Sequence, residues 1–237
     1  MMRKIKFLRR RIKAMILHFL KKDLLILPQS RKRVVEYGSD YGAWAVLEDS
    51  LDDASTVLSF GIGTDASFDL ALIDTFGLKV HAYDPTPKSI NWVEDTIDNP
   101  NFVFSPVGLS QENGTLELYL PANSKFVSAS LKEGEETSSN TITVQVKSLD
   151  TICRESALSK IDYLKMDIEG SEYGVICALK NLDRKLLPKQ LAIEFHHFQS
   201  AFRRTDTLNS IKDLNELGYR IVWSSGTCRE ILFILAS

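Results

Sequence analysis

The sequence predicts an α/β protein built on a doubly wound, mostly parallel, Rossmann-like sheet of seven strands. Three observations carry this prediction. Short apolar runs alternate with helical patterns in the order βαβαβ, which is typical of parallel sheets with right-handed crossovers. The alternation resumes after an interruption in the middle of the chain. Two final apolar runs follow each other with no helix between them, so we expect a terminal antiparallel hairpin.

The first strand, the first helix and the second strand are the clearest elements. Residues 57–60 form an apolar run that leads into a glycine-rich turn. The helix after this turn has one apolar face, formed by Phe68, Ala71, Leu72 and Phe76. We expect it to end at Gly77, because glycine accepts the left-handed backbone that terminates many helices. The second strand covers residues 79–83.

The second helix is expected to begin at Pro85-Thr86-Pro87, where Thr86 can cap it and Pro87 fits its first turn. Its apolar face consists of Ile90, Val93 and Ile97. The remaining elements are expected at 101–105 (strand), 148–157 (helix), 161–166 (strand), 172–181 (helix), 190–195 (strand), 206–217 (helix), 219–223 (strand) and 229–235 (strand).

An inserted β-hairpin is expected to interrupt the alternation of strands and helices. Glu112-Asn113-Gly114-Thr115 carries the Asn-Gly signal of a tight hairpin turn. Two alternating runs belong to the insertion, the first with Leu116, Leu118 and Leu120 and the second with Ile142, Val144 and Val146. A polar loop at about 121–140 separates them.

Charge divides the chain into a basic arm, residues 1–33, and one globular domain, residues 34–237. Of the 237 residues, 44% are hydrophobic, which suffices for the core of a single domain. The arm holds twelve Lys or Arg and one acidic residue, whereas the domain holds 17 basic and 30 acidic residues. A basic arm on an acidic body indicates a partner surface for the arm.

Apolar residues recur at helical spacing within the arm, at Ile5, Leu8, Ile12, Met15, Ile16 and Phe19. The apolar run 14–20 is much shorter than the ~20 residues of a membrane span, and no small-residue cleavage site follows it. Three interpretations stay open, namely a helix packed on its own domain, an interfacial membrane helix and a nucleic-acid arm. The apolar stripe argues against nucleic acid.

The cysteines indicate the compartment. Cys153, Cys177 and Cys228 are too few and too scattered for a disulfide framework or a zinc site. This favours a reducing environment. We therefore expect a cytoplasmic protein, which the basic arm can bring into peripheral contact with a membrane.

The glycine-rich turn after the first strand predicts a cofactor site. Gly61 and Gly63 lie at the carboxyl end of that strand, where doubly wound sheets bind ligands and where glycine allows a ligand to approach the backbone. Asp84 ends the second strand about twenty residues later, where a carboxylate accepts hydrogen bonds from ribose hydroxyls. Asp65, in the same turn, completes the expected cofactor-binding set.

Two features favour S-adenosylmethionine over a nicotinamide dinucleotide as the cofactor. Asp65 lies where a pyrophosphate would approach the start of the helix, and its carboxylate would repel that group but tolerate a sulfonium. The terminal antiparallel hairpin also suits a methyltransferase better than a dehydrogenase. An NAD-dependent dehydrogenase and a plain strand-to-helix turn without a ligand stay open as alternatives.

The most specific segment of the chain is LKMDIEGSE. Together with VLSFGIGTDASFDLAL, HAYDPTP, FSPVGLSQENGTLELY, VKSLDTI and LAIEFHHF, it resembles the FkbM-type methyltransferases, in particular their methyltransferase-like branch, over about residues 37–236. The resemblance implies a class I S-adenosylmethionine-dependent methyltransferase with Gly61, Gly63 and Asp84 as cofactor contacts. It also implies that YGSDYGAW, residues 37–44, covers the cofactor. The chain departs from the general first motif at Ser59, where an acid is usual, and at Asp65, where glycine is common.

The resemblance implies methyl transfer to a hydroxyl. We therefore predict O-methylation of a small-molecule, glycan or lipid acceptor. A methyltransferase-like module without catalytic activity, which binds a membrane or a partner through its arm, is the alternative from a different class of function.

Acidic and histidine side chains follow two neighbouring strands of the predicted sheet. Asp167 and Glu169 come after the strand at 161–166, and Glu194 and His196 come at the end of the next one. Because a hydroxyl acceptor needs a base or a metal to lose its proton, we expect Asp167, Glu194 and His196 to be catalytic.

Two versions of this cluster are open. Asp167, Glu194 and His196 are candidate ligands of a divalent cation, with Glu169 in reserve. Without a metal, His196 is the candidate base, because its ordinary pKa lies near neutrality. The competing structural interpretation is that the acids merely stabilise the start of the following helix and that the histidines are packed and hydrogen-bonded.

Overall fold

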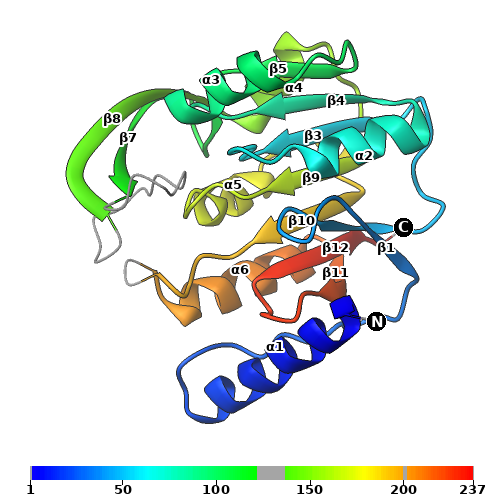
Figure 1. The fold of residues 1–237 in the computed structure, drawn as a ribbon, viewed down its shortest axis with the longest axis vertical. Helices are drawn as coiled ribbons and strands as arrows, with labels where there is room; N and C mark the ends of the chain where they lie inside the picture. Colours follow the sequence, from blue (N-terminus) through cyan, green and yellow to red (C-terminus); the bar gives the residue numbers. More distant parts are fainter. Residues whose placement is uncertain (1, 122–136, 200–201, 237) are drawn as a thin grey trace.

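The computed structural model describes residues 2–121, 137–199 and 202–236. Its centre is a seven-stranded sheet in the order β11-β12-β10-β9-β3-β4-β5 (Figure 1). Six strands run in the same direction, and β12 runs antiparallel to them between its neighbours β10 and β11. The predicted fold class is confirmed. The strands are β3 (Thr56–Phe60), β4 (Lys79–Tyr83), β5 (Phe102–Ser105), β9 (Tyr163–Met166), β10 (Gln190–Glu194), β11 (Tyr219–Ser224) and β12 (Glu230–Leu235).

Two apolar cores, one on each face of the sheet, hold the fold together. One lies beneath α2 and α3, and the other beneath α4, α5 and α6. Side chains alternate between the faces along each strand, so in β9 Tyr163 enters the first core while Leu164 and Met166 enter the second. The helices are α2 (Ser67–Phe76), α3 (Pro87–Thr96), α4 (Leu149–Glu155), α5 (Glu172–Leu179) and α6 (Arg204–Glu216), with a short 3-10 helix η1 (Arg184–Leu186) before β10.

The helix ends follow the sequence signals with one exception. Gly77 ends α2 with a φ of +70°, and its N–H donates to the carbonyl of Ile73. Thr86 occupies the position before α3, but its side chain makes no capping hydrogen bond. The predicted position of the cap is correct, but the predicted capping hydrogen bond is wrong, because the Thr86 hydroxyl donates instead to Asp84 Oδ1 at 2.6 Å.

The inserted hairpin is confirmed, but its predicted turn is not. β7 (Gly114–Pro121) and β8 (Thr137–Lys147) pair antiparallel, and β6 (Gly108–Leu109) joins the far side of β8. The Asn-Gly pair therefore begins β7 rather than turning between two paired strands. Asn113 is used otherwise, since its side chain accepts from the Ser148 N–H and donates to Thr151 Oγ1. Most of the expected polar loop lies outside the described residues.

A small two-stranded sheet, not expected from the sequence, covers one face of the central sheet. β1 (Val34–Tyr37) and β2 (Trp44–Leu47) pair antiparallel. Ala45 is buried, and its carbonyl accepts a hydrogen bond of 2.8 Å from the Tyr163 hydroxyl in β9. These strands fix both ends of the segment 38–43.

The N-terminal helix α1 (Met2–Phe19) lies against the β11–β12 edge of the domain (Figure 1). The segment that follows it is built into the domain, because Leu24 and Ile26 are buried in a core. Gln29 also hydrogen-bonds β11 at Ile221 through both its backbone and its side chain. Among the described residues, no helix is long and apolar enough to cross a membrane.

Candidate active site

A cavity of about 520 Å³ opens at the carboxyl ends of β3, β4, β9 and β10. This volume is in the range of small-molecule and cofactor sites, and the location is where doubly wound sheets bind ligands. Its walls include all four predicted cofactor-binding residues and three carboxylates of the predicted cluster region, namely Gly61, Gly63, Asp65, Asp84, Asp167, Glu169 and Glu194.

The two glycines form a tight turn against the neighbouring strand. Gly61 has a φ of +81° and Gly63 a φ of +58°, which is the left-handed region that favours glycine. A Cβ atom on Gly61 would lie 1.7 Å from the backbone oxygen of Asp167. Gly61 is therefore required for the close contact between the glycine turn and the backbone of Asp167, in addition to its predicted role in ligand binding.

Asp84 ties the end of β4 to the glycine turn. It is 5% exposed, and its Oδ2 accepts the Gly63 N–H at 2.9 Å. Its Oδ1 accepts both the N–H and the hydroxyl of Thr86. Because an ionised carboxylate has about four acceptor positions, one on Oδ2 is left for a ligand hydroxyl.

Asp65 fixes the segment between β1 and β2 over the turn. Its Oδ1 accepts the Ser67 N–H at 2.8 Å, and its Oδ2 accepts the Ser39 hydroxyl at 2.7 Å. Ser39 Oγ in turn accepts the Gly42 N–H. Burial alone would raise the pKa of Asp65, but the hydrogen bonds from Ser67 and Ser39 hold it below its ordinary value. The segment implied to cover the cofactor thus lies on the cavity wall.

A buried lysine supplies positive charge behind the turn. Lys165 of β9 is 5% exposed, and its Nζ donates to the Gly61 carbonyl at 2.7 Å. The same Nζ lies 5.2 Å from the ring centroid of Trp44, a cation–π contact. Lys165 is not predicted from the sequence, because a lysine within an apolar run indicates only an interruption of the strand.

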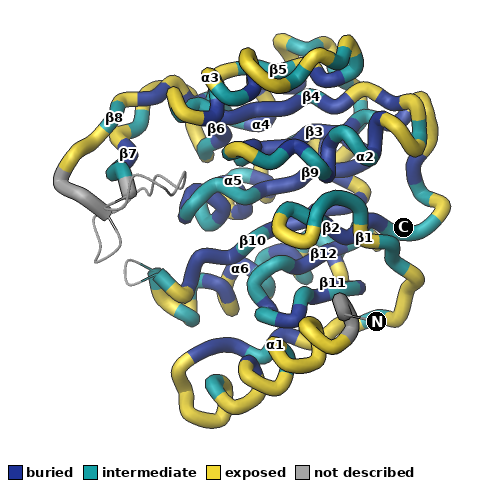
Figure 2. Tube along the Cα trace, in the orientation of Figure 1, coloured by how far each residue is buried: buried dark blue, intermediate teal, exposed yellow. Residues whose placement is uncertain are grey.

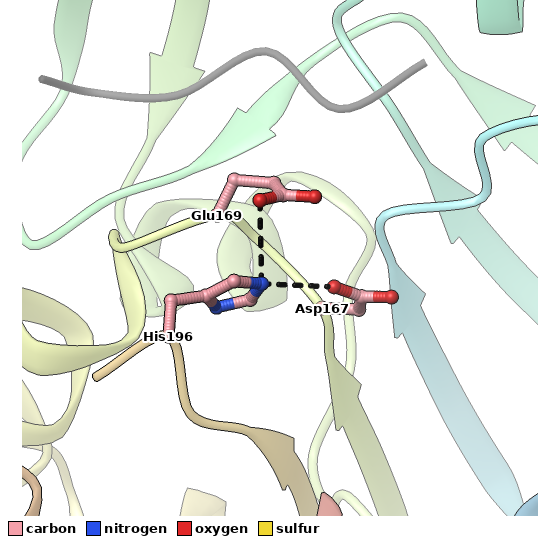
Figure 3. Close-up of side chains that lie close together, drawn as sticks. All are labelled: Asp167, Glu169 and His196. Carbon is pink, nitrogen blue, oxygen red and sulfur yellow. Dashed lines mark ion pairs between the residues drawn. The ribbon is translucent and has the colours of Figure 1, made fainter. Parts of the chain in front are cut away.

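Asp167, Glu169 and His196 come together beyond the ends of β9 and β10 (Figure 3). His196 Nε2 lies 3.3 Å from Glu169 Oε2 and 3.6 Å from Asp167 Oδ1. Asp167 and Glu169 line the cavity, whereas His196 is 2% exposed and lies behind them. Each residue of this group offers one ligand atom within 4.8 Å of the others. Glu194 lies on the cavity wall outside this group.

A fully buried glutamate orients His196. Glu172 Oε1 accepts from the His196 backbone N–H at 3.0 Å and lies 3.1 Å from His196 Nδ1. Glu172 Oε2 accepts the Gly170 N–H at 2.8 Å. The role of Glu172 is not predicted from the sequence, because an acidic residue in the first turn of a helix is ordinary. The signal that could have found it is its place in LKMDIEGSE.

The loop between Asp167 and α5 is held in an unusual backbone conformation. Glu169 has a φ of +52°, which is uncommon for a residue with a side chain. Gly170 has a φ of +108°, and a Cβ atom there would lie 2.0 Å from the Phe202 ring. Gln199 donates to Glu169 Oε2 at 2.8 Å. Such constrained conformations gather at functional sites, where the surrounding structure stabilises them.

The crowding of acids shifts their protonation. Burial, with a contribution from Glu169, raises the pKa of Asp167 to about 6. Burial and the charge of Asp167 raise the pKa of Glu194 well above its ordinary value. Burial opposes the charged form of His196, but the adjacent Glu172 outweighs it and raises the pKa of His196 well above 6.5. The carboxylate of Glu172 therefore favours the imidazolium form of His196 over the neutral ring.

The second histidine of the predicted region serves a different part of the structure. His197 Nε2 lies 2.8 Å from Asp23 Oδ1, and its Nδ1 lies 3.2 Å from Thr207 Oγ1. Asp23 also pairs with Arg229 at 3.6 Å. His197 thus links α6 to the segment after α1, which matches the packed and hydrogen-bonded role considered above for the histidines.

Comparison with known proteins gives one family and a set of distant structures. A family model described as the methyltransferase FkbM domain matches residues 61–221. A complex of the Haloferax volcanii Trm112 methyltransferase activator with a candidate methyltransferase has 10% identity and a TM-score of 0.41, covering 79% of this chain and 84% of that one. The Methanococcus jannaschii fibrillarin pre-rRNA processing protein has 11% identity and a TM-score of 0.43, covering 88% and 85%. Both TM-scores are too low to inform function. A search of curated proteins found no match.

Proposed function

Because the chain belongs to the FkbM methyltransferase family, we propose that it transfers a methyl group from S-adenosylmethionine to a hydroxyl acceptor. One observation carries the proposal: the carboxylate of Asp167 lines the cavity directly beside the glycine turn, and burial there raises its pKa to about 6. A base in this place suits an acceptor that must lose a proton as it is methylated.

The charge of the cavity supports S-adenosylmethionine as the cofactor. Eight acidic and four basic residues line the cavity. A nicotinamide dinucleotide carries an anionic pyrophosphate, which such a wall repels, whereas the sulfonium cofactor carries net positive charge. This balance supports the methyltransferase over the NAD-dependent dehydrogenase.

The residues of the turn fit the parts of this cofactor. Asp84 has an acceptor position free for a ribose hydroxyl, and Gly61 and Gly63 line the cavity without side chains that would fill it. Asp65 holds the segment 38–43 in place beside them. When bound, the cofactor supplies an electrophilic methyl group.

Two carboxyl groups take different roles in the proposed chemistry. Asp167, ionised above a pH of about 6, accepts the proton of the acceptor hydroxyl. Burial and the charge of Asp167 raise the pKa of Glu194 well above its ordinary value, which suits its carboxyl group to donate a hydrogen bond to the acceptor.

His196 is proposed as a positioning residue rather than the base. As an imidazolium, its Nε2 faces Asp167 and Glu169 and favours their ionised forms. The competing proposal, a divalent cation at Asp167, Glu194 and His196, requires a neutral imidazole because a metal ligand must be deprotonated. In its support, Asp167 and His196 form a compact group, with Glu169 in the place of Glu194.

The test combines binding and turnover. S-adenosylhomocysteine and NAD are titrated into the protein by calorimetry, and methyl transfer is followed as S-adenosylhomocysteine release with sugars, phospholipids and small alcohols as acceptors. The proposal expects S-adenosylhomocysteine to bind, NAD not to bind, and a chelator to leave turnover unchanged. Binding of NAD alone would contradict it, chelator-sensitive turnover would support the cation, and cofactor binding without turnover would support the inactive module.

A further inference from the structure

Helix α1 contacts the domain along only one side. Arg11 donates to the carbonyls of Ile26 at 3.1 Å and Ser224 at 3.0 Å, and Ala14 is 4% exposed. The rest of the helix is largely exposed (Figure 2). Six apolar side chains lie on this outer surface, with exposed fractions from 43% to 79%: Ile5, Leu8, Ile12, Met15, Ile16 and Phe19. We call these six the apolar stripe.

The apolar stripe is continuous and has a basic border. On a helix of 100° per residue, its six side chains fall within an arc of about 100°, on the side away from Arg11 and Ala14. Arg9 and Lys13 are exposed beside this arc, and Lys21 and Lys22 are exposed just after the helix. Packing on the domain therefore explains the buried side of α1, but it does not explain the apolar stripe.

Exposed apolar patches of this kind mark interaction surfaces on soluble domains. The partner must offer an apolar layer beneath the apolar stripe and negative charge beside it. An anionic phospholipid surface offers both, because its acyl boundary accepts apolar side chains while its headgroups attract Lys and Arg.

Other partners match only part of this surface. A nucleic acid offers negative charge but no apolar layer. A second copy of the chain offers an apolar stripe, but pairing would bring together two arms that each hold twelve basic residues and one acid. The rest of the chain, with 17 basic and 30 acidic residues, would be repelled from an anionic surface, so α1 is the part suited to contact it.

We propose that α1 lies in the interface of an anionic membrane, with its apolar stripe inserted and Arg9 and Lys13 at the headgroups. Docking in this way would also orient the cavity. Lys6 and Arg10 line the cavity from the domain-facing side of the same helix, so the cavity edge would lie within about one helix diameter, 10–12 Å, of the membrane surface. The proposal goes beyond methyl transfer and does not depend on it.

Vesicle flotation with the full-length chain tests the proposal. Vesicles of phosphatidylcholine with phosphatidylglycerol should bind the protein, and vesicles of phosphatidylcholine alone should bind it much less. Binding should weaken as ionic strength rises from about 0.01 M to about 1 M, because the attraction is screened. Leu8→Glu/Ile16→Glu should lower binding to the mixed vesicles about tenfold or more.

A matched control separates the apolar stripe from hydrophobicity in general. Val103 and Leu208 are exposed apolar residues in β5 and α6, so Val103→Glu/Leu208→Glu makes the same chemical change outside α1. This control should bind within about twofold of the unmodified protein. As a second probe that keeps the apolar stripe intact, Arg9→Gln/Lys13→Gln should lose about fivefold per charge on the mixed vesicles only.

Three results would overturn the proposal. One is equal flotation of the unmodified protein and both α1 variants. Another is a dimer, measured by light scattering, that Leu8→Glu/Ile16→Glu dissociates while no variant binds vesicles. The third is binding to duplex DNA that exceeds vesicle binding and is unaffected by the loss of the apolar stripe. Circular dichroism of each variant shows whether it is folded.

Discussion

Ionisable side chains are usually exposed and apolar side chains are usually buried. Two regions of the molecule depart from this rule in opposite ways, namely the cluster around His196 and the helix α1. At the cluster, Glu172 and His196 are ionisable groups that are almost fully buried. On α1, Leu8 and Phe19 are large apolar side chains that are mostly exposed. Charged residues are seldom buried without partners, and contiguous apolar patches are seldom left exposed on a monomer.

The two regions differ in where these side chains find their partners. The buried carboxylate of Glu172 finds its partners inside the chain, since it accepts hydrogen bonds from His196 and Gly170. The apolar stripe of α1 has its proposed partner outside the chain, in the anionic membrane surface. Changes at the cluster should therefore act on catalysis and stability, and changes in the apolar stripe should act on neither.

Asp167→Asn should have the largest effect on activity. Loss of a general base typically costs about 10²–10⁴-fold in rate. Asparagine keeps the shape of the side chain, so S-adenosylhomocysteine affinity should stay within about twofold. Turnover and calorimetry measure the two quantities, and Asp95→Asn, an exposed change in α3, is the control. Near-normal turnover of a folded Asp167→Asn variant would remove the residue from the mechanism.

Glu172→Gln should have the largest effect on stability. Breaking one partner of a buried charge pair typically lowers the free energy of unfolding by about 3–5 kcal/mol. Glu216→Gln is a matched control, because Glu216 pairs with Lys212 at 3.8 Å on the exposed face of α6 and such pairs contribute little. Denaturant unfolding measures both variants. Equal losses in the two would show that burial of the His196 pair carries no special weight.

Asp84→Ala should have a smaller effect, confined to the cofactor side of the cavity. Loss of a charged hydrogen-bond partner typically costs about 1–3 kcal/mol, so S-adenosylhomocysteine should bind about 5–150-fold more weakly. Calorimetry on the folded variant measures this loss. Asp74→Ala, an exposed change in α2, should leave affinity unchanged. Unaltered affinity in Asp84→Ala would contradict the assignment of the ribose contact.

Leu8→Glu/Ile16→Glu should have the smallest effect on the folded domain. Exposed surface changes usually alter the free energy of unfolding by no more than about 0.5 kcal/mol. Denaturant unfolding and turnover with a soluble acceptor should both match those of the unmodified protein. A loss of several kcal/mol would show that the apolar stripe packs on the domain in solution, and the contrast with the cluster would disappear.

Local patterns account for the part of the fold that the sequence predicts. The strands beside Gly61 and Asp84 combine apolar runs with turn residues, and α2 ends at Gly77 as its glycine signal indicates. β1 and β2 were not predicted, because they are short and are stabilised by contacts with residues that are distant in sequence. Tyr163, whose hydroxyl bonds Ala45, lies 118 residues away in sequence.

The candidate site shows the same limit. The topology of two adjacent parallel strands brings Asp167 and His196 together, so their proximity could be predicted from strand order. The role of Glu172 could not, because it depends on a contact across 24 residues between a helix start and a strand end. The sequence also could not predict whether the apolar stripe faces the domain or the solvent, since periodicity defines a stripe but not which side of α1 contacts the domain.

The pH dependence of methyl transfer, measured with a chelator present, tests the central claim most directly. The pKa of Asp167 is raised to about 6, so its ionised, proton-accepting form predominates above that pH and is lost below it. With the hydroxyl acceptor that gives turnover, kcat/KM should rise about tenfold per pH unit up to about 6 and then level off, and Asp167→Asn should abolish this rise. A rate that stays flat from about pH 5 to 7.5, or that vanishes with the chelator, would contradict Asp167 as the base of a metal-free methyltransferase.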